Sequence, residues 1–230
     1  MAAIFKVECR RGRGFGAQVM EQQQVVLVHG LFMSGAEMAY LGSGLRAGGY
    51  RVHRFRYPSR LITPQEGAAL LAKYIMGLHA DPVHLVGHSL GGILIMHLFH
   101  RCADLPEGRI VLLGSPVLGS KTARRAACFT TGRFLLNQAM SGLVKAAPPW
   151  RGERPLGVIA GTRGLGVGRL LSGVAGIHDG TVSVSETEVA QADDQCCLPV
   201  SHTGMLFSRA VVRQTLTFLR RGCFERIGRS

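Results

Sequence analysis

The sequence predicts an α/β fold with a mostly parallel, doubly wound sheet flanked by helices. Short apolar segments that suit buried strands alternate with longer segments that suit helices. The chain has 230 residues, of which 47% are hydrophobic and 18% are charged, so it can bury the core of one domain. We expect a flexible or edge segment over residues 1–20 and a single domain over residues 21–230.

The first half of the chain shows the alternation most regularly. Apolar segments predict strands at Val25–Val28, Tyr50–Phe55 and Val83–Val86. Helices are expected from Ser34, acting as N-cap, to about Gly48, from Pro64 to about His79, and after the third strand to about Ala103. Strands and helices at these intervals indicate a parallel sheet.

The second half is less regular. Strands are expected at Arg109–Leu113, at Leu156–Ala160 and near Cys196–Val200, and the last helix at about Met205–Arg221. Residues 119–150 interrupt the rhythm with basic and apolar side chains that end at Pro148-Pro149-Trp150. We interpret them as a small helical cap insertion over the site described next. An ordinary crossover helix with long loops fits this segment nearly as well.

The segment Pro82–Gly92, PVHLVGHSLGG, carries the clearest chemical signal. It places a G-x-S-x-G motif, centred on Ser89, between an apolar strand and the apolar helical segment Ile93–Phe99. In that context the serine occupies a strained turn that exposes its hydroxyl as a nucleophile. Small residues at Gly87 and Gly91 let the strand and the helix pass close to the turn. An ordinary serine in a glycine-rich turn explains this context less well.

A serine nucleophile needs a base and an acid that orients it, and after such a turn they follow in the order Ser, Asp or Glu, His. Two histidines, His178 and His202, lie beyond the helix that follows Ser89. We assign the base to His202, in a polar loop before the last helix, and the acid to Asp179. The competing carboxylates are in a polar stretch that we interpret as solvated surface: Glu186, Glu188, Asp193 and Asp194.

The oxyanion that forms during attack needs backbone N–H donors. One donor should be the amide of Leu90, directly after the nucleophile. The second should come from the loop after the first strand, where Leu31 is the first choice and Phe32 the reserve. The apolar side chains of Phe32 and Met33 then favour an acyl or other hydrophobic group as substrate.

Charge and composition restrict the remaining function classes. Lys and Arg outnumber Asp and Glu by 27 to 14, a formal net charge of +13. Because the basic residues are scattered, without an aromatic-interleaved cluster, we do not expect nucleic-acid binding. Contact with an anionic membrane surface stays open, although no amphipathic anchor helix is clear. The oligomeric state is not predicted.

No pattern in the chain predicts a cofactor. Metal-ligand spacings are missing, and Gly114–Thr122 places its lysine one position too late for a phosphate-binding loop. The six cysteines show no C-x-x-C spacing, and the N-terminus lacks the apolar region of a secretory signal. We therefore expect a cytoplasmic protein that needs neither metal nor cofactor.

Five segments together resemble the motifs of small bacterial α/β hydrolases of the lipase/esterase kind, including the GPI-inositol-deacylase-like group of serine hydrolases. They are VLVHGLFMSG, VGHSLGG, GSPVLGS, HDGTVSVSET and SHTGM, and the resemblance covers about residues 25–220. It implies the α/β-hydrolase fold, with Ser89 as nucleophile, Asp179 as orienting acid, His202 as base, and Leu31 and Leu90 as oxyanion donors.

The activity implied by the resemblance is cleavage of a small-molecule or lipid ester through an acyl-enzyme, without a cofactor. An acyltransferase or a thioesterase could use the same three side chains, because an alcohol replaces water in the first case and a thiol leaves in the second. A non-catalytic binding protein with this fold is the alternative from another class, since a fold does not determine a function.

Overall fold

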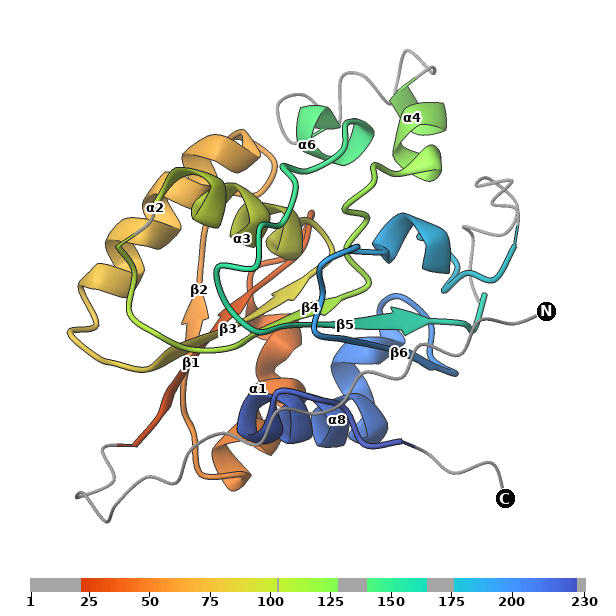
Figure 1. Ribbon diagram of the computed structural model, residues 1–230. Coiled ribbons are helices and arrows are strands. Elements are labelled where there is room, and N and C mark those ends of the chain that lie inside the picture. Colours follow the sequence, from red (N-terminus) through yellow and green to blue (C-terminus); the bar gives the residue numbers. More distant parts are fainter. Residues whose placement is uncertain (1–21, 103, 128–139, 165–175, 227–230) are drawn as a thin grey trace.

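A central parallel sheet organises the computed structural model, which describes residues 22–102, 104–127, 140–164 and 176–226 (Figure 1). The described residues contain six strands, all parallel, in the order β2-β1-β3-β4-β5-β6. They are β1 (Gln24–Val28), β2 (Arg51–Phe55), β3 (Val83–His88), β4 (Ile110–Leu113), β5 (Leu156–Gly161) and β6 (Asp194–Leu198). The predicted doubly wound α/β sheet is confirmed.

Helices cover both faces of the sheet (Figure 1). One face carries α1 (Ala39–Ala47) and α8 (Arg209–Arg221), and the other carries α2 (Pro64–Met76) and α3 (Leu90–Arg101). Strand residues alternate between the two faces, because successive side chains of a strand point in opposite directions. In β1, Val26 and Val28 pack toward α2 and α3, whereas Val25 and Leu27 pack toward α1 and α8.

Local capping interactions explain where the helices begin. Thr63 and Glu66 form a reciprocal capping box at the start of α2, and Pro64 takes the first helical position as predicted. The predicted N-cap at Ser34 is wrong. Gly35, at φ 89°, precedes a short 3₁₀ helix (Ala36–Met38), and α1 follows that helix.

The last helix also begins later than predicted. Residues Gly204–Phe207 form a separate 3₁₀ helix, and α8 begins at Arg209. The hydroxyl of Ser208 accepts a hydrogen bond from the Val211 amide, which makes Ser208 the N-cap. Strand β6 is displaced by two residues from its predicted range, because it ends at Leu198.

The predicted cap insertion lies between β4 and β5. Its described parts include α4 (Lys121–Ala127) and α6 (Met140–Val144), which lie together beyond the carboxyl ends of the central strands (Figure 1). A hydrogen bond of 2.7 Å from the Ser120 amide to the Leu143 carbonyl connects the two ends of the insertion. Its central residues, 128–139, lie outside the described part of the chain.

Sheet topology places the candidate site. The chain passes from β1 to β2 on one side and then returns to β3 on the other side of β1. In open α/β sheets, ligands bind beyond the carboxyl ends of the strands where the strand order reverses in this way. The turn after β3 holds Ser89, and the loop after β1 holds Leu31. Both predicted segments therefore meet at this point.

None of the helices in the described residues combines the length and the apolarity needed to cross a bilayer. Likewise, those residues contain no group of three or more His, Cys, Asp or Glu side chains arranged to hold a metal ion.

Candidate active site

Ser89 occupies a sharply strained turn between β3 and α3. Its backbone has φ 53° and ψ −120°, a conformation that costs a non-glycine residue about 1–3 kcal/mol. Hydrogen bonds hold the turn on both sides, from the Ser89 amide to the Leu113 carbonyl at 2.9 Å and from the Gly92 amide to the Ser89 carbonyl at 3.0 Å. A side chain at Gly91 would overlap the Val28 carbonyl, so only glycine fits there. The predicted nucleophile turn therefore has its expected geometry.

Asp179 and His202 form a short hydrogen bond beside the same end of the sheet. The distance from His202 Nδ1 to Asp179 Oδ2 is 2.7 Å, and Asp179 is buried. The other carboxylate oxygen accepts hydrogen bonds from the amides of Thr181 at 2.9 Å and Val182 at 2.8 Å. Every oxygen of the buried carboxylate thus has a donor, which fixes its orientation toward His202.

The direction of this hydrogen bond follows from its partners. An ionised carboxylate only accepts hydrogen bonds, so Nδ1 of His202 is the donor. The backbone strengthens the pairing, since the His202 amide donates to the Asp179 carbonyl at 3.0 Å. Two hydrogen bonds to Asp179 therefore fix the position of His202, one from its ring and one from its backbone.

The space around this pair is restricted. Gly114, at φ +55°, lies so close that an added Cβ would stand 3.1 Å from Asp179 Oδ2 and 3.2 Å from His202 Nδ1. The chain after β4 thus passes close beside the hydrogen bond between Asp179 and His202.

The competing groups are held in other interactions. Glu186 accepts hydrogen bonds from the amides of Lys121 and Ser183, and Asp194 accepts one from the Phe224 amide. Both carboxylates are buried, so describing them as solvated surface was wrong, whereas Glu188 and Asp193 are exposed as predicted.

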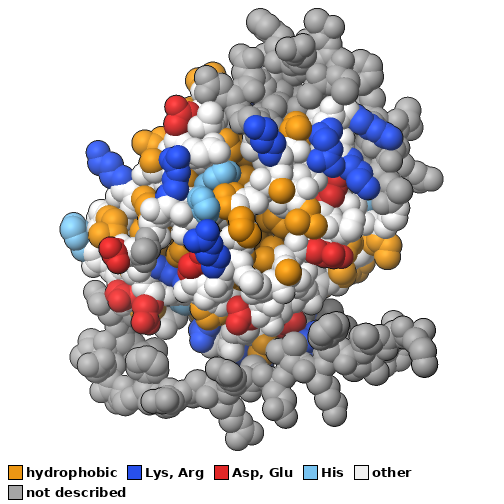
Figure 2. Space-filling model, turned by 45° about the horizontal axis from the view of Figure 1, so that its top comes forward, with side chains coloured by type: hydrophobic (Ala, Val, Ile, Leu, Met, Phe, Trp, Pro, Cys, Tyr) orange, Lys and Arg blue, Asp and Glu red, His pale blue; other side chains and the backbone are white. Residues whose placement is uncertain are grey.

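A cavity of about 300 Å³ is lined by most of the predicted site residues. Ser89 and His202 lie in its wall, together with Leu31, Phe32 and Met33. The insertion contributes further lining through Ser120, Thr122, Ala123 and Leu143. Figure 2 brings this end of the molecule forward and shows hydrophobic side chains near the centre of the face, with Lys and Arg side chains around them. The structure therefore brings the predicted serine and base to one largely apolar cavity.

The loop after β1 is held by buried polar contacts. Tyr57 donates its hydroxyl hydrogen to the His29 carbonyl at 2.8 Å and stacks on the His29 ring at 4.4 Å between centroids. His29 Nδ1 lies 2.9 Å from the Gly30 carbonyl. An added Cβ at Gly30 would stand 3.1 Å from Ser89 Cβ, so the loop passes directly beside Ser89. Leu31 follows at once in this loop.

Leu90 begins α3, where the first amides have no carbonyl partner within the helix. The two amides predicted to hold an oxyanion, those of Leu31 and Leu90, thus belong to segments on either side of Ser89. Their role as donors stays a prediction.

A comparison with known families decides the classification. A sequence model described as the alpha/beta hydrolase family matches residues 25–216. The chain belongs to the alpha/beta hydrolase family. Among curated relatives of this chain, RutD of Pantoea ananatis (strain LMG 20103), named as a carbamate hydrolase, is 40% identical over 79 residues. That match covers 34% of the present chain and 28% of RutD, so the chain matches less than a third of the relative's length.

Solved structures show the same α/β-hydrolase fold. The lipase BlEst2 of Bacillus licheniformis, in mature form, aligns with a TM-score of 0.69 and 22% identity, covering 90% of this chain and 93% of the lipase. The metagenomic carboxyl esterase MGS0156 aligns with a TM-score of 0.68 and 17% identity, covering 84% of this chain and 68% of the esterase. At these identities, the similarity establishes the fold alone.

His88 is a site residue to which the sequence assigned no role. It precedes Ser89 in the turn, is fully buried, and its Nε2 lies 3.0 Å from the His202 carbonyl. Because a carbonyl only accepts hydrogen bonds, Nε2 of His88 must carry the proton. The contact therefore connects the turn at Ser89 to the loop at His202, and the rings of His88 and His202 lie 4.8 Å apart. The position before Ser89 in the motif was the only available signal.

Burial, together with the nearby positive charge of a protonated His202, lowers the pKa of His88 from 6.5 to about 3. Between these values the unfolded chain binds a proton that folded His88 excludes. The free energy of unfolding should therefore decrease as pH falls through this range, by up to about 1.4 kcal/mol per pH unit from this group.

Urea unfolding of wild type and His88→Gln across that pH range measures this contribution. Glutamine cannot be protonated but keeps an N–H donor for the His202 carbonyl. We expect a shallower pH dependence in the variant, and equal slopes for the two proteins would contradict the assignment.

Proposed function

We propose that this α/β hydrolase cleaves carboxylic esters with Ser89 as nucleophile, His202 as base and Asp179 as orienting acid. The observation that carries the proposal is the 2.7 Å hydrogen bond from His202 Nδ1 to buried Asp179, with Ser89 and His202 lining one apolar cavity. A nucleophile, a base and an orienting acid are the groups that acyl transfer by a serine requires, which supports the proposal.

In the first half of the reaction, His202 Nε2 takes the hydroxyl proton of Ser89 while Ser89 Oγ attacks the ester carbonyl. The resulting oxyanion accepts hydrogen bonds from the amides of Leu31 and Leu90. As the tetrahedral intermediate collapses, the protonated His202 gives the proton to the departing alkoxide oxygen, and the alcohol leaves. The acyl group remains bonded to Ser89.

Water completes the cycle. His202 removes a proton from a water molecule, whose oxygen attacks the acyl carbon and forms a second tetrahedral intermediate. The bond to Ser89 Oγ then breaks, Oγ recovers its proton from His202, and a carboxylic acid is released. Throughout, Asp179 stabilises the imidazolium form of His202 without being protonated itself.

The cavity supports a substrate with a small apolar acyl group. Its volume of about 300 Å³ stands at the lower end of the range of about 300–1,000 Å³ that is typical of small-molecule sites. The walls nearest the insertion are formed by the buried side chains of Ala123 and Leu143. Long acyl chains would have to extend past these side chains.

Carbamate hydrolysis is a second candidate, because the partial match to RutD concerns a protein named for that reaction. Ser89, assisted by His202 and Asp179, can attack the carbonyl of a carbamate or of a thioester in the same way. Competition among p-nitrophenyl esters, carbamates and acyl thioesters, compared by kcat/KM, separates these substrates. Added alcohols test acyl transfer through a change in product ratio. If none of these substrates is hydrolysed, the result favours a non-catalytic binding protein.

Acyl-chain preference tests the cavity itself. We expect p-nitrophenyl butyrate to exceed the palmitate in kcat/KM by roughly tenfold or more, because each poorly placed methylene forfeits about 1–3 kcal/mol of pocket binding. The substitution Leu143→Ala enlarges the cavity and should therefore raise kcat/KM for the palmitate relative to the butyrate.

The matched control is Val144→Ala, which changes the next residue of α6 without lining the cavity. The ratio of two substrates on one sample is independent of how much protein is folded. An unchanged ratio in Leu143→Ala, or an equal shift in Val144→Ala, would show that this wall does not select the acyl group.

A further inference from the structure

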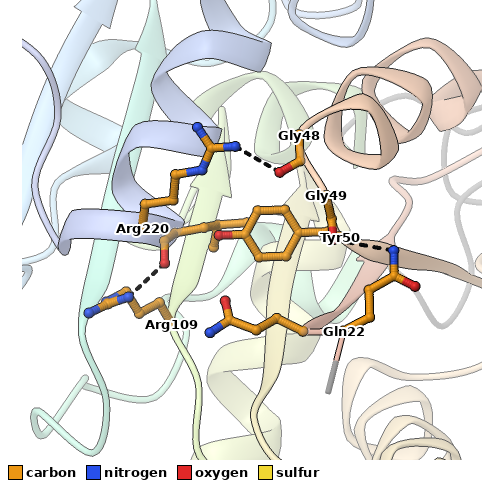
Figure 3. A pocket seen from close by; sticks show the side chains of 8 residues that line it. Gln22, Gly48, Gly49, Tyr50, Arg109 and Arg220 are labelled. Atoms are coloured by element: carbon orange, nitrogen blue, oxygen red, sulfur yellow. Dashed lines mark hydrogen bonds between the residues drawn. The ribbon is translucent and has the colours of Figure 1, made fainter. Parts of the chain in front are cut away.

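A second cavity, of about 430 Å³ (Figure 3), lies where β1, β2 and β4 begin, whereas Ser89 follows the end of β3. Its lining residues precede parallel strands or end helices. Gln22 and Gln23 precede β1, Tyr50 precedes β2, and Arg109 precedes β4. Gly48 follows α1, and Arg220 belongs to the last turn of α8. None of these residues takes part in the proposed reaction.

The lining of this cavity is rich in hydrogen-bond donors. It contains the guanidinium groups of Arg109 and Arg220, the side-chain amides of Gln22 and Gln23, and the hydroxyl of Tyr50. Among the residues that the structure describes, no carboxylate lines it, and the ion pairs found there involve neither Arg109 nor Arg220. In Figure 3 the Tyr50 ring lies between Gln22 and the two arginines. The cavity is therefore chemically suited to a negatively charged ligand.

Both arginines are held in place by the backbone. Arg220 Nη2 donates to the Gly48 carbonyl at 2.7 Å, and Arg109 Nη1 donates to the Leu219 carbonyl at 2.6 Å. A guanidinium has five N–H donors, so each of these bonds leaves several N–H groups for another partner. The hydrogen bonds to helix ends thus position the two charges without exhausting their donors.

The charge balance also favours an anion. Two helix C-termini reach this end of the sheet, and each contributes about half a negative charge. The two guanidiniums together contribute two positive charges, so a net excess of about one positive charge remains. The positive charges of Arg220 and Arg109 act directly on the Tyr50 hydroxyl, where they oppose the rise in pKa that burial causes. The Tyr50 hydroxyl and both guanidinium groups therefore lie close enough to interact electrostatically.

We propose that this cavity binds the oxyanion of a phosphate group, with Arg109 and Arg220 as charged donors and Tyr50 as a neutral donor. Planar guanidiniums suit phosphate oxygens because they donate two parallel hydrogen bonds. The phosphate could belong to a small soluble molecule or to a lipid headgroup, and the chemistry of recognition is the same.

Calorimetric titration of the full chain with inorganic phosphate and with glycerol 3-phosphate tests the site, with ionic strength held constant by sodium chloride. We expect saturable binding in wild type that weakens roughly tenfold or more in Arg220→Gln, since a charge-assisted hydrogen bond is lost. Tyr50→Phe, which removes only a hydroxyl, should weaken binding less. It provides a second measurement should Arg220→Gln fold poorly.

Arg221→Gln is the matched control, because it removes the same charge from the neighbouring exposed residue of α8 and does not line the cavity. Equal weakening in Arg220→Gln and Arg221→Gln would overturn the proposal in favour of the overall positive charge.

Vesicles of phosphatidylglycerol, compared with phosphatidylcholine, distinguish the source of the phosphate. Binding to the anionic vesicles alone, with dependence on Arg220, would identify a lipid headgroup. An absence of saturable binding to phosphate, glycerol 3-phosphate and anionic vesicles would overturn the proposal. These measurements do not depend on ester hydrolysis, so they test the phosphate site independently of the proposed function.

Discussion

Replacing Ser89 with alanine is expected to reduce kcat for ester hydrolysis by about 10⁴–10⁶-fold while leaving the fold intact. The substitution removes only the hydroxyl group, and the strained turn is held by backbone hydrogen bonds that alanine also makes. Residual hydrolysis would reflect only binding and oxyanion stabilisation. Steady-state hydrolysis of p-nitrophenyl butyrate and covalent labelling by a fluorophosphonate, located by mass spectrometry, measure the effect.

Ser120 provides the control for this experiment, because it is a second serine in the same cavity. Its hydroxyl accepts a hydrogen bond from the Ala123 amide at 3.1 Å, and within the described part of the chain no histidine forms a hydrogen bond with it. Ser120→Ala should therefore keep kcat within about tenfold of wild type, as expected for a residue that does not react. Loss of labelling in Ser120→Ala with retention in Ser89→Ala would reverse the assignment.

The fold and the order of the site residues could be predicted because both are expressed in local sequence patterns. Strand β3 and helix α3 are continuous apolar segments, and the Gly-x-Ser-x-Gly turn between them has few other structural uses. Asp179 and His202 could be chosen by their order along the chain. Their 2.7 Å contact, however, depends on a pairing across 23 residues that no local pattern encodes.

Features that depend on tertiary contacts escaped prediction. Buried Glu186 was taken for surface because its polar neighbours resemble a solvated loop, yet it caps its own turn and accepts from the Lys121 amide. The importance of His88 depends on the distant His202 carbonyl, 114 residues away in sequence. Hydrogen bonds of this kind are formed by the folded chain as a whole, so composition and spacing carry no trace of them.

The substitution Asp179→Asn is expected to lower kcat by about 10⁴-fold, although it changes few atoms. The amides of Thr181 and Val182 must still be satisfied, so the asparagine oxygen should face them and its NH₂ group should face His202. That NH₂ group can only donate, which forces Nδ1 of His202 to give up its proton. The proton then resides on Nε2, and His202 can no longer accept one from Ser89.

The variant Asp194→Asn is a matched control that distinguishes an effect on catalysis from an effect on stability. Asp194 is another buried carboxylate, and it accepts a hydrogen bond from the Phe224 amide at 2.8 Å, away from the cavity. Asp194→Asn should lower the free energy of unfolding by about 1–3 kcal/mol, the cost of weakening charged hydrogen bonds, with kcat of the folded fraction unchanged. Urea unfolding and active-site titration of both variants provide the comparison. If Asp179→Asn lost only stability while its titrated sites kept the wild-type kcat, the hydrogen bond to His202 would be structural, and another group would have to orient the base.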